Sequence, residues 1–256
     1  MNNFSNTFSS TLGKKLVMCL TGLFLSSFLI VHLTGNFQLF KNDAGLAFNQ
    51  YAHFMTHFTP IKVVSYLLYS SIIVHSVWAI IITLYNRKAR PQAYAIKPKD
   101  GSIWSSRNMG ILGTILFVFI VVHMSNFWYQ YHWGETPFVE YRTDLNTGVT
   151  ITKEIQASEF TDYVSYVDNG VEITKSKDLY KETQFAFHQW WLVAFYVLAM
   201  GALSFHLVHG FQSAFQTLGW NHHKYRPLIK FVGLWIFSIL IPIGFAAMPL
   251  YFFLVK

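Results

Sequence analysis

Four histidines lie inside long apolar segments of this 256-residue chain, each in a different segment. They are His32, His75, His123 and His206. An ionisable side chain within a membrane span is costly and usually marks a functional site. Imidazole is also the commonest protein ligand for metals. Four such residues on four separate segments therefore indicate two metal centres, each held from two sides.

The composition places the chain in the membrane class. Hydrophobic residues make up 53% of the sequence and charged residues only 12%, whereas soluble domains carry about 25% charged residues. Backbone groups cannot stay unpaired in lipid, so long apolar segments are expected to be helices. The first segment follows Lys14-Lys15 and exceeds the length of a signal-peptide core, so we expect it to be retained. The predicted spans are about 13–39, 61–86, 108–132, 186–218 and 228–254.

The basic residues predict the sidedness of these spans. They gather before the first span, between the second and third, and between the fourth and fifth: Lys14, Lys15, Arg87, Lys88, Arg90, Lys97, Lys99, Arg107, Lys224, Arg226 and Lys230. By the positive-inside rule this predicts an all-α bundle of five transmembrane helices, with the N-terminus cytoplasmic and the C-terminus outside. The net charge of +7 therefore reflects membrane topology. No RNA-binding motif accompanies it, and we expect no nucleic-acid partner.

The segment 134–185 is the largest part expected outside the membrane. It holds ten of the twelve acidic residues and falls on the outer side. Asp168-Asn169-Gly170 between two β-rich runs predicts a hairpin, and Asn146-Thr147-Gly148 is a weaker turn signal. We expect a small β-rich extramembrane loop there. A solvated loop without a role of its own is the alternative.

The depths of the four histidines predict how they pair. Counted from the basic ends of their segments, His32 and His123 lie about 24–25 Å along the helix, in the outer half. His75 lies about 18 Å from its basic end, and His206 about 27 Å in from the outer end of its segment, so both are nearer the inner side. The expected pairs are His32 with His123 and His75 with His206.

A facing pair of histidines at one depth is the arrangement that a bis-histidine haem requires. The sequence has a single cysteine, Cys19, and no C-x-x-C-H motif, so a disulfide, an iron–sulfur cluster and covalent haem attachment within this chain are excluded. This predicts two non-covalent haems b. Zinc favours four ligands that converge on one point, so two pairs of histidines at different depths suit it less well. Histidines hydrogen-bonded across a bundle are the alternative, and His209 could compete with His206.

Two glycines precede the outer histidines at the same spacing. Gly22 stands ten residues before His32, and Gly113 ten residues before His123. Each is about 15 Å inward of its histidine, at roughly the depth of the inner pair. A glycine there leaves room for a flat macrocycle, although small-residue helix packing would also explain it.

Three stretches of the sequence resemble one known family. They are Thr21-Gly22-Leu23-Phe24 leading to His32, Phe48-Asn49 through Ala52-His53-Phe54-Met55, and His206 followed by Gly210 and Gly219-Trp220. In order, spacing and five-span layout, the chain is similar to the dihaem cytochrome b membrane-anchor subunit of succinate dehydrogenase or fumarate reductase. The resemblance covers nearly all of the chain except the enlarged segment 134–185.

The resemblance implies a role in the respiratory complex II of the tricarboxylic acid cycle. The chain would be a multi-pass protein of a bacterial cytoplasmic (inner) membrane, with a flavoprotein subunit and an iron–sulfur subunit docked on its cytoplasmic face. Electrons would enter at the inner haem, pass to the outer haem and reduce a quinone, typically menaquinone. In this family the fourth ligand stands four residues before a glycine, here Gly210, which selects His206 over His209.

Positive side chains are expected to partner the haem propionates. Arg107, at the inner end of the third span, is the candidate for the inner haem, and a positive-inside anchor is its alternative role. The basic loop 87–107 and the segment Gly219–Lys230 would form much of the face that docks the iron–sulfur subunit.

A quinone needs two hydrogen-bond partners in an apolar pocket. Polar side chains gather near the expected outer haem, and among them His53, Asn36 and Gln50 are the candidate quinone ligands. Every acidic residue lies outside the predicted spans, so we expect no carboxylate proton relay within the bundle.

Two other functions compete with the anchor of a succinate or fumarate enzyme. A dihaem anchor of a formate dehydrogenase or a hydrogenase usually places two histidine ligands on one helix, whereas here each ligand has its own. A histidine-based proton-coupled transporter would need intramembrane acids or broken helices.

Overall fold

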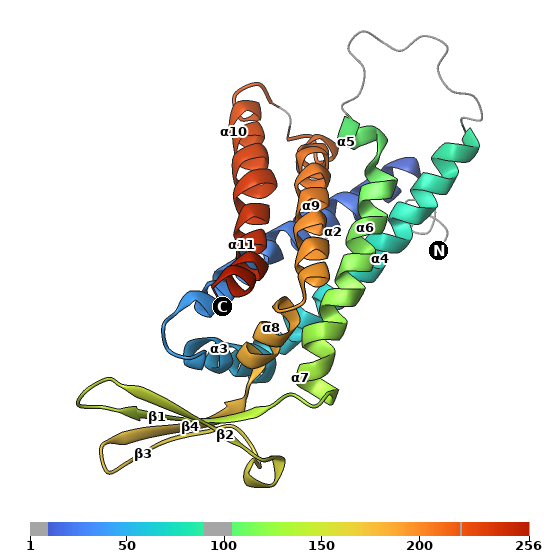
Figure 1. Ribbon diagram of the computed structural model, residues 1–256. Coiled ribbons are helices and arrows are strands. Elements are labelled where there is room, and N and C mark those ends of the chain that lie inside the picture. Colours follow the sequence, from blue (N-terminus) through green and yellow to red (C-terminus); the bar gives the residue numbers. More distant parts are fainter. Residues whose placement is uncertain (1–9, 90–103, 221, 256) are drawn as a thin grey trace. The chain divides into compact units, whose positions relative to one another are not determined.

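The computed structural model describes residues 10–89, 104–220 and 222–255 (Figure 1). The protein is mostly helical, with a small four-stranded antiparallel sheet. Its chain forms two compact units. Unit 1 comprises Met1–Ile30, Ser65–Phe119 and Val197–Ala246; unit 2 comprises Val31–Val64, Ile120–Tyr196 and Ala247–Lys256.

Five helical stretches are long and apolar enough to cross a membrane, which confirms the predicted number of apolar helices. They are Leu12–Phe40, Thr59–Lys88, Met109–Trp133, Trp190–Thr217 and Arg226–Leu254. The helices that build them are α2 (Thr11–Asn36) with η1 (Phe37–Phe40), α4 (Thr59–Ala89), α6 (Met109–His123) with η2 (Met124–Tyr129) and α7 (Gln130–Trp133), α9 (Trp190–Thr217), and α10 (Arg226–Phe231) with η4 (Val232–Leu240) and α11 (Ile241–Leu254).

Three of these stretches are not regular α-helices throughout. The first ends in the 3₁₀ helix η1. The segments η2 and η4 are π-helical. Within η4, the hydroxyl of Ser238 donates a hydrogen bond to the backbone carbonyl of Gly233 at 2.6 Å. The side chain thus supplies a donor to one of the carbonyls of the π-helical turn. π-Helical turns are rare and occur frequently at functional sites. The segment η2 begins directly after His123.

The fourth apolar helix starts later than the sequence pattern predicted. The prediction began at residue 186, whereas α9 begins at Trp190 and a separate helix α8 (Leu179–Phe187) precedes it. Asp178 caps α8, because its carboxylate accepts a hydrogen bond from the backbone amide of Lys181 at 3.0 Å. The segment 134–185 therefore contains a helix start in addition to its strands.

The predicted β-rich segment forms a sheet in the order β2-β1-β4-β3. Its strands are β1 (Phe138–Asp144), β2 (Thr150–Ile155), β3 (Val164–Asp168) and β4 (Val171–Lys177), all antiparallel to their neighbours. The turn between β3 and β4 has positive φ at Asn169 (49°) and Gly170 (80°). Both angles are those of the two-residue hairpin turn that Asp-Asn-Gly predicted. A short helix η3 (Ala157–Glu159) joins β2 to the second hairpin.

One buried amide fastens helix α3 (Leu46–His57) to this sheet. Asn49 is 1% exposed, and its Nδ2 donates to the hydroxyl of Tyr141 on β1 at 2.8 Å and to the carboxylate of Asp178 at 2.9 Å. Its Oδ1 accepts from the backbone amide of Tyr180 at 3.0 Å. These three hydrogen bonds satisfy most of the amide's capacity, so Asn49 has a structural role in unit 2.

Candidate metal centres

The inner pair of histidines meets within unit 1. His75 lies on α4 and His206 on α9, and their ring centroids are 6.4 Å apart at an interplanar angle of 62°. His209, the alternative ligand on α9, forms no ring contact with His75 among the described residues. The geometry therefore brings together the two histidines that the sequence had paired by depth.

Thr21 on α2 fixes which nitrogen of His75 carries the proton. Its hydroxyl donates to the carbonyl of Val17 at 2.7 Å and lies 2.9 Å from Nδ1 of His75. Since a hydroxyl has only one proton, Thr21 accepts from Nδ1–H of His75. The lone pair of His75 is then on Nε2, the tautomer that a metal ligand needs, with the second nitrogen held by a hydrogen bond.

Two glycines lie close to the rings of the inner pair. A Cβ added at Gly22 would lie 3.3 Å from Cε1 of His75, so the glycine lets the ring approach α2 closely. Gly210 lies one turn after His206, and a Cβ there would be 4.0 Å from its ring. Gly113 is half-buried on α6, yet a Cβ there would meet no atom within 4 Å. Unit 1 thus has open space at the glycine where the sequence analysis predicted room for a macrocycle.

The outer pair of histidines meets within unit 2. His32 on α2 and His123 on α6 have ring centroids 5.7 Å apart, with their planes at 86°. The hydroxyl of Tyr196 lies 3.3 Å from Nδ1 of His123. Nδ2 of Asn36, one turn after His32, is 3.5 Å from Nε2 of His32, which is long for a hydrogen bond.

Aromatic side chains enclose His123. Phe127 and Tyr196 lie 5.3 Å and 6.0 Å from its ring, centroid to centroid. Phe187 at the end of α8 packs against both of these rings, at 5.8 Å and 5.1 Å. The π-helical segment η2, which follows His123, carries Phe127. This locally wider part of the helix therefore contributes to the aromatic wall around His123. This wall was not predicted from the sequence, because apolar periodicity does not reveal a π-helical turn.

Both ring separations fit a metal held between two imidazoles. A metal–imidazole nitrogen bond is about 2 Å long. The ring centroid lies roughly 1 Å behind that nitrogen, so two imidazoles on opposite sides of one metal have centroids about 6 Å apart. The observed separations are 5.7 Å and 6.4 Å. Within the described ranges, no group of three or more His, Cys, Asp or Glu side chains converges on one point, so each pair offers two protein ligands.

Unsatisfied buried polar atoms lie near both pairs. Such atoms normally have hydrogen-bond partners in folded proteins. In the part of the chain that the structure describes, Nδ1 of His206 and Nε1 of Trp78, three residues after His75, have none. Nδ2 of Asn126, three residues after His123, also has none. The indole N–H of Trp78 and the amide of Asn126 suit a ligand that carries acceptors, as the carboxylates of haem do, whereas Nδ1 of an iron-ligating His206 would point away from the haem. The residues present are therefore compatible with haem.

The candidate quinone ligands do not form one cluster among the described contacts. Asn36 lies beside His32, whereas the ring of His53 is stacked against His57 at 4.0 Å and against Tyr163 at 3.9 Å. Both faces of the His53 ring are therefore covered by other rings, and only its edge can meet a ligand. Gln50 is half-buried on α3 without a hydrogen-bond partner among the described residues.

Unit 2 also contains a cavity that the sequence analysis missed. Its volume is about 150 Å³, and Tyr180, Gln184, His188, Tyr251 and Phe252 line it. Aromatic walls with a few hydrogen-bonding groups are typical of small-molecule sites, although this cavity is smaller than most. The residues come from α8, α11 and the turn before α9, so nothing in the linear pattern brings them together.

The candidate propionate partner lies in a short helix of unit 1. Arg107 ends α5 (Trp104–Arg107) and its side chain is exposed. Trp104 in the same helix packs against Phe205, the neighbour of His206, at 5.4 Å between ring centroids. This contact ties α5 to the helix of the inner pair. Arg90, Lys97 and Lys99, predicted to help form the docking face, lie outside the described residues.

Comparisons with protein-family models, with curated proteins and with solved structures find no match to this chain. The functional assignment therefore depends on the chemistry of the two histidine pairs.

Proposed function

We propose that this chain is the dihaem cytochrome b membrane anchor of a succinate dehydrogenase or fumarate reductase. It would carry electrons through two haems b between an iron–sulfur subunit and a membrane quinone, with menaquinone the expected substrate. Its location would be a bacterial cytoplasmic membrane, with the N-terminus and the basic loops on the cytoplasmic side.

One observation supports the proposal above all. Each of the four intramembrane histidines lies on a different apolar helix, and they meet in two pairs with ring centroids 5.7 Å and 6.4 Å apart. Both distances suit a metal held by two imidazoles. The resemblance of Thr21–Phe24, Phe48–Met55 and His206–Gly210 to the anchor family supports the choice of enzyme.

The protein's own residues have defined tasks in this proposal. His75 and His206 would ligate one iron, and His32 and His123 the other. Thr21 holds the proton of His75 on Nδ1, and Tyr196 lies at hydrogen-bond distance from Nδ1 of His123. Haem b, when bound, supplies reversible one-electron chemistry at iron, and the protein tunes it through ligands, hydrogen bonds and burial.

The soluble partners would be a flavoprotein subunit and an iron–sulfur subunit. We propose that Arg107 and the segment Gly219–Lys230 contribute to their docking face, where the chain carries basic residues. Arg107 is also proposed to partner a propionate of the inner haem. On the outer side, Asn36, Gln50 and His53 stay candidates for the quinone, together with the cavity between Tyr180 and Tyr251.

Two alternative functions are less well supported. A dihaem anchor of a formate dehydrogenase or a hydrogenase shares the chemistry, but four ligands on four helices favour the succinate and fumarate type. A proton-coupled transporter would need carboxylates or broken helices in the spans, and the sequence has no carboxylate in the predicted spans.

A reduced-minus-oxidised absorption spectrum of the purified chain tests the proposal. We expect a b-type α-band and two haems per chain. His32→Ala, His75→Ala, His123→Ala and His206→Ala should each lose about one haem. His209→Ala is the matched control, since it changes a histidine of the same helix and should keep both haems. A purified protein without bound haem would refute the proposal. Succinate-dependent reduction of a menaquinone analogue by the intact complex would then separate the enzyme families.

A further inference from the structure

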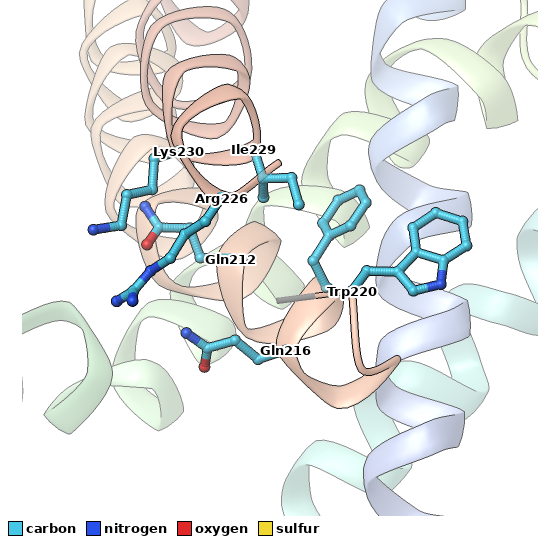
Figure 2. A pocket seen from close by; sticks show the side chains of 7 residues that line it. Gln212, Gln216, Trp220, Arg226, Ile229 and Lys230 are labelled. Atoms are coloured by element: carbon cyan, nitrogen blue, oxygen red, sulfur yellow. The ribbon is translucent and has the colours of Figure 1, made fainter. Parts of the chain in front are cut away.

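A groove in unit 1 lies where α9 ends and α10 begins (Figure 2). Gln212 and Gln216 come from α9, Arg226 and Lys230 from α10, and Trp220 from the connection between them. Figure 2 shows the two amides and the two cationic groups gathered on one side of the groove, with Trp220 on the other. The groove thus combines a polar, positively charged wall with an aromatic one.

The four polar side chains of this wall have no partner in the described part of the chain. Among the described residues, Gln212, Gln216, Arg226 and Lys230 form no side-chain hydrogen bond and no ion pair. A guanidinium, an ammonium and two amide groups together present many N–H donors. Such a set suits a multivalent anion, and phosphate is the group that arginine and lysine bind most often in this manner.

The described residues of unit 1 include no acid that could neutralise the groove. The only carboxylate residue in the sequence of unit 1 is Asp100, which lies outside the described residues. All three ion pairs among the described residues lie in unit 2, within the sheet and α8. Within the described residues the groove thus has no protein counter-charge, so its two exposed cationic groups are available to an external anion.

The groove lies at the edge of the membrane-spanning helices. The fourth apolar stretch ends at Thr217, and the fifth begins at Arg226. Trp220 and Tyr225 are 64% and 55% exposed, and such aromatic residues concentrate at the membrane–water interface. Leu228 and Phe231 of α10 are 61% and 56% exposed and are apolar. An occupant with a charged head and hydrocarbon chains would meet all of these side chains.

We propose that this groove binds the phosphate headgroup of an anionic phospholipid. Arg226 and Lys230 supply the charge, Gln212 and Gln216 donate hydrogen bonds to the phosphate oxygens, and Trp220 packs against the glycerol region. Basic pockets between membrane helices are known to recognise anionic headgroups. The groove contains none of the four paired histidines, so the lipid proposal can be tested independently of the haem proposal.

Arg226 and Lys230 belong to the segment Gly219–Lys230 that is proposed to contribute to a docking face, and the lipid proposal assigns these two side chains to the headgroup instead. Exposed Leu228 and Phe231 favour lipid over a water-soluble partner at this groove, because a docking face on the aqueous side would leave them in water. The two occupants also differ in what removes them. A lipid is displaced by another lipid of the same charge, and a protein subunit is not.

Native mass spectrometry of the full-length chain, released from nanodiscs of dioleoyl-phosphatidylglycerol and dioleoyl-phosphatidylcholine, tests the site. We expect the wild-type chain to retain about one phosphatidylglycerol more strongly than any phosphatidylcholine. R226Q/K230Q should weaken that retention by roughly tenfold or more, because each basic residue near the surface contributes about fivefold. K41Q/K62Q is the matched control, since it removes the same charge from exposed positions in unit 2, and it should retain the lipid.

Two further measurements identify the source of the anion and keep the site testable if one variant misfolds. Inorganic phosphate at millimolar concentration should not displace the lipid, and displacement would overturn the assignment to a phospholipid. Q212A/Q216A keeps the charge and should weaken retention several-fold, so the site stays testable if R226Q/K230Q does not fold. Equal retention in wild type and both groove variants overturns the proposal, as does loss of soluble subunits from R226Q/K230Q with lipid retained.

Discussion

The hydroxyl of Thr21 lies 2.9 Å from Nδ1 of His75 and donates its own proton to the carbonyl of Val17. A threonine on one helix thereby sets the tautomer of a histidine on another. Groups that hold the second nitrogen of a metal-bound histidine commonly change metal affinity by 10–100-fold when they are removed. The contact therefore offers a direct way to test the inner pair.

We expect Thr21→Val to weaken haem binding at the inner pair by roughly tenfold or more. The substitution keeps the shape of the side chain but leaves Nδ1–H of His75 without its acceptor. Haem titration of the apoprotein and the midpoint potential of the inner haem are the measurements. Thr21→Ser retains the hydroxyl and should behave like the wild type. If Thr21→Val has the same haem affinity and the same midpoint potential of the inner haem as the wild type, the contact between Thr21 and His75 does not influence a haem ligand.

Gly113 tests whether open space in unit 1 belongs to a cofactor. A Cβ at this half-buried position meets nothing within 4 Å. If haem fills that space, Gly113→Leu should lower the haem content from two to about one per chain without loss of the helical circular dichroism. Gly201→Leu is the control, since Gly201 is exposed and its Cβ also meets nothing. Full haem content in Gly113→Leu would place the cofactor elsewhere.

Gly35 packs directly against the ring of Tyr51 in unit 2. A Cβ at position 35 would lie 2.3 Å from the ring, so alanine forces the helix or the ring to move. We expect Gly35→Ala to destabilise the protein by about 1–3 kcal/mol, the usual cost of overpacking. Thermal unfolding in detergent measures this. Tyr51→Leu in the same chain should recover part of the loss, and additive effects of the two changes would argue against the clash.

The stack of His53 on Tyr163 should be sensitive to acid. Burial lowers the pKa of His53 below its ordinary value of about 6.5, and the nearby His57 lowers the pKa further, whereas Asp162 raises it. A depressed pKa means that the folded state prefers the neutral ring. Its contribution to stability is therefore complete above about pH 6.5 and is lost as the pH falls below that value.

Hydrogen exchange of residues 160–165 at pH 7.5 and pH 5 measures this effect. We expect faster exchange at pH 5, after correction for the intrinsic rate. His53→Phe keeps a stacked ring without a titrating group and should reduce the difference. A difference of the same size in His53→Phe would assign the pH response to another residue.

The sequence was informative about the membrane helices because a span leaves a long apolar run. The positions of His32, His75, His123 and His206 along those runs predicted which rings meet, since depth in a straight helix follows from residue count. The Asp168-Asn169-Gly170 turn was equally predictable, because few residues accept its positive φ angles.

Other features depend on contacts that no local pattern records. The π-helical segment after His123 has the same apolar composition as a regular helix, so it was not predicted. Asn49 stands in the stretch Phe48–Met55 that carries the family resemblance, and no local pattern predicted the three buried hydrogen bonds that commit it to the sheet and to α8. His53 lies against Tyr163, 110 positions along the chain, and hydrophobic periodicity does not encode such a pairing.

Asn49 also constrains the order of events during synthesis. Its partners Tyr141, Asp178 and Tyr180 lie 92, 129 and 131 residues further along the chain. When α3 leaves the ribosome, its buried amide has no partner, and two helical spans and the whole sheet must follow before the last one arrives. A chain that stops before residue 180 therefore lacks the last of these partners, and we expect its Asn49 amide to be incompletely paired.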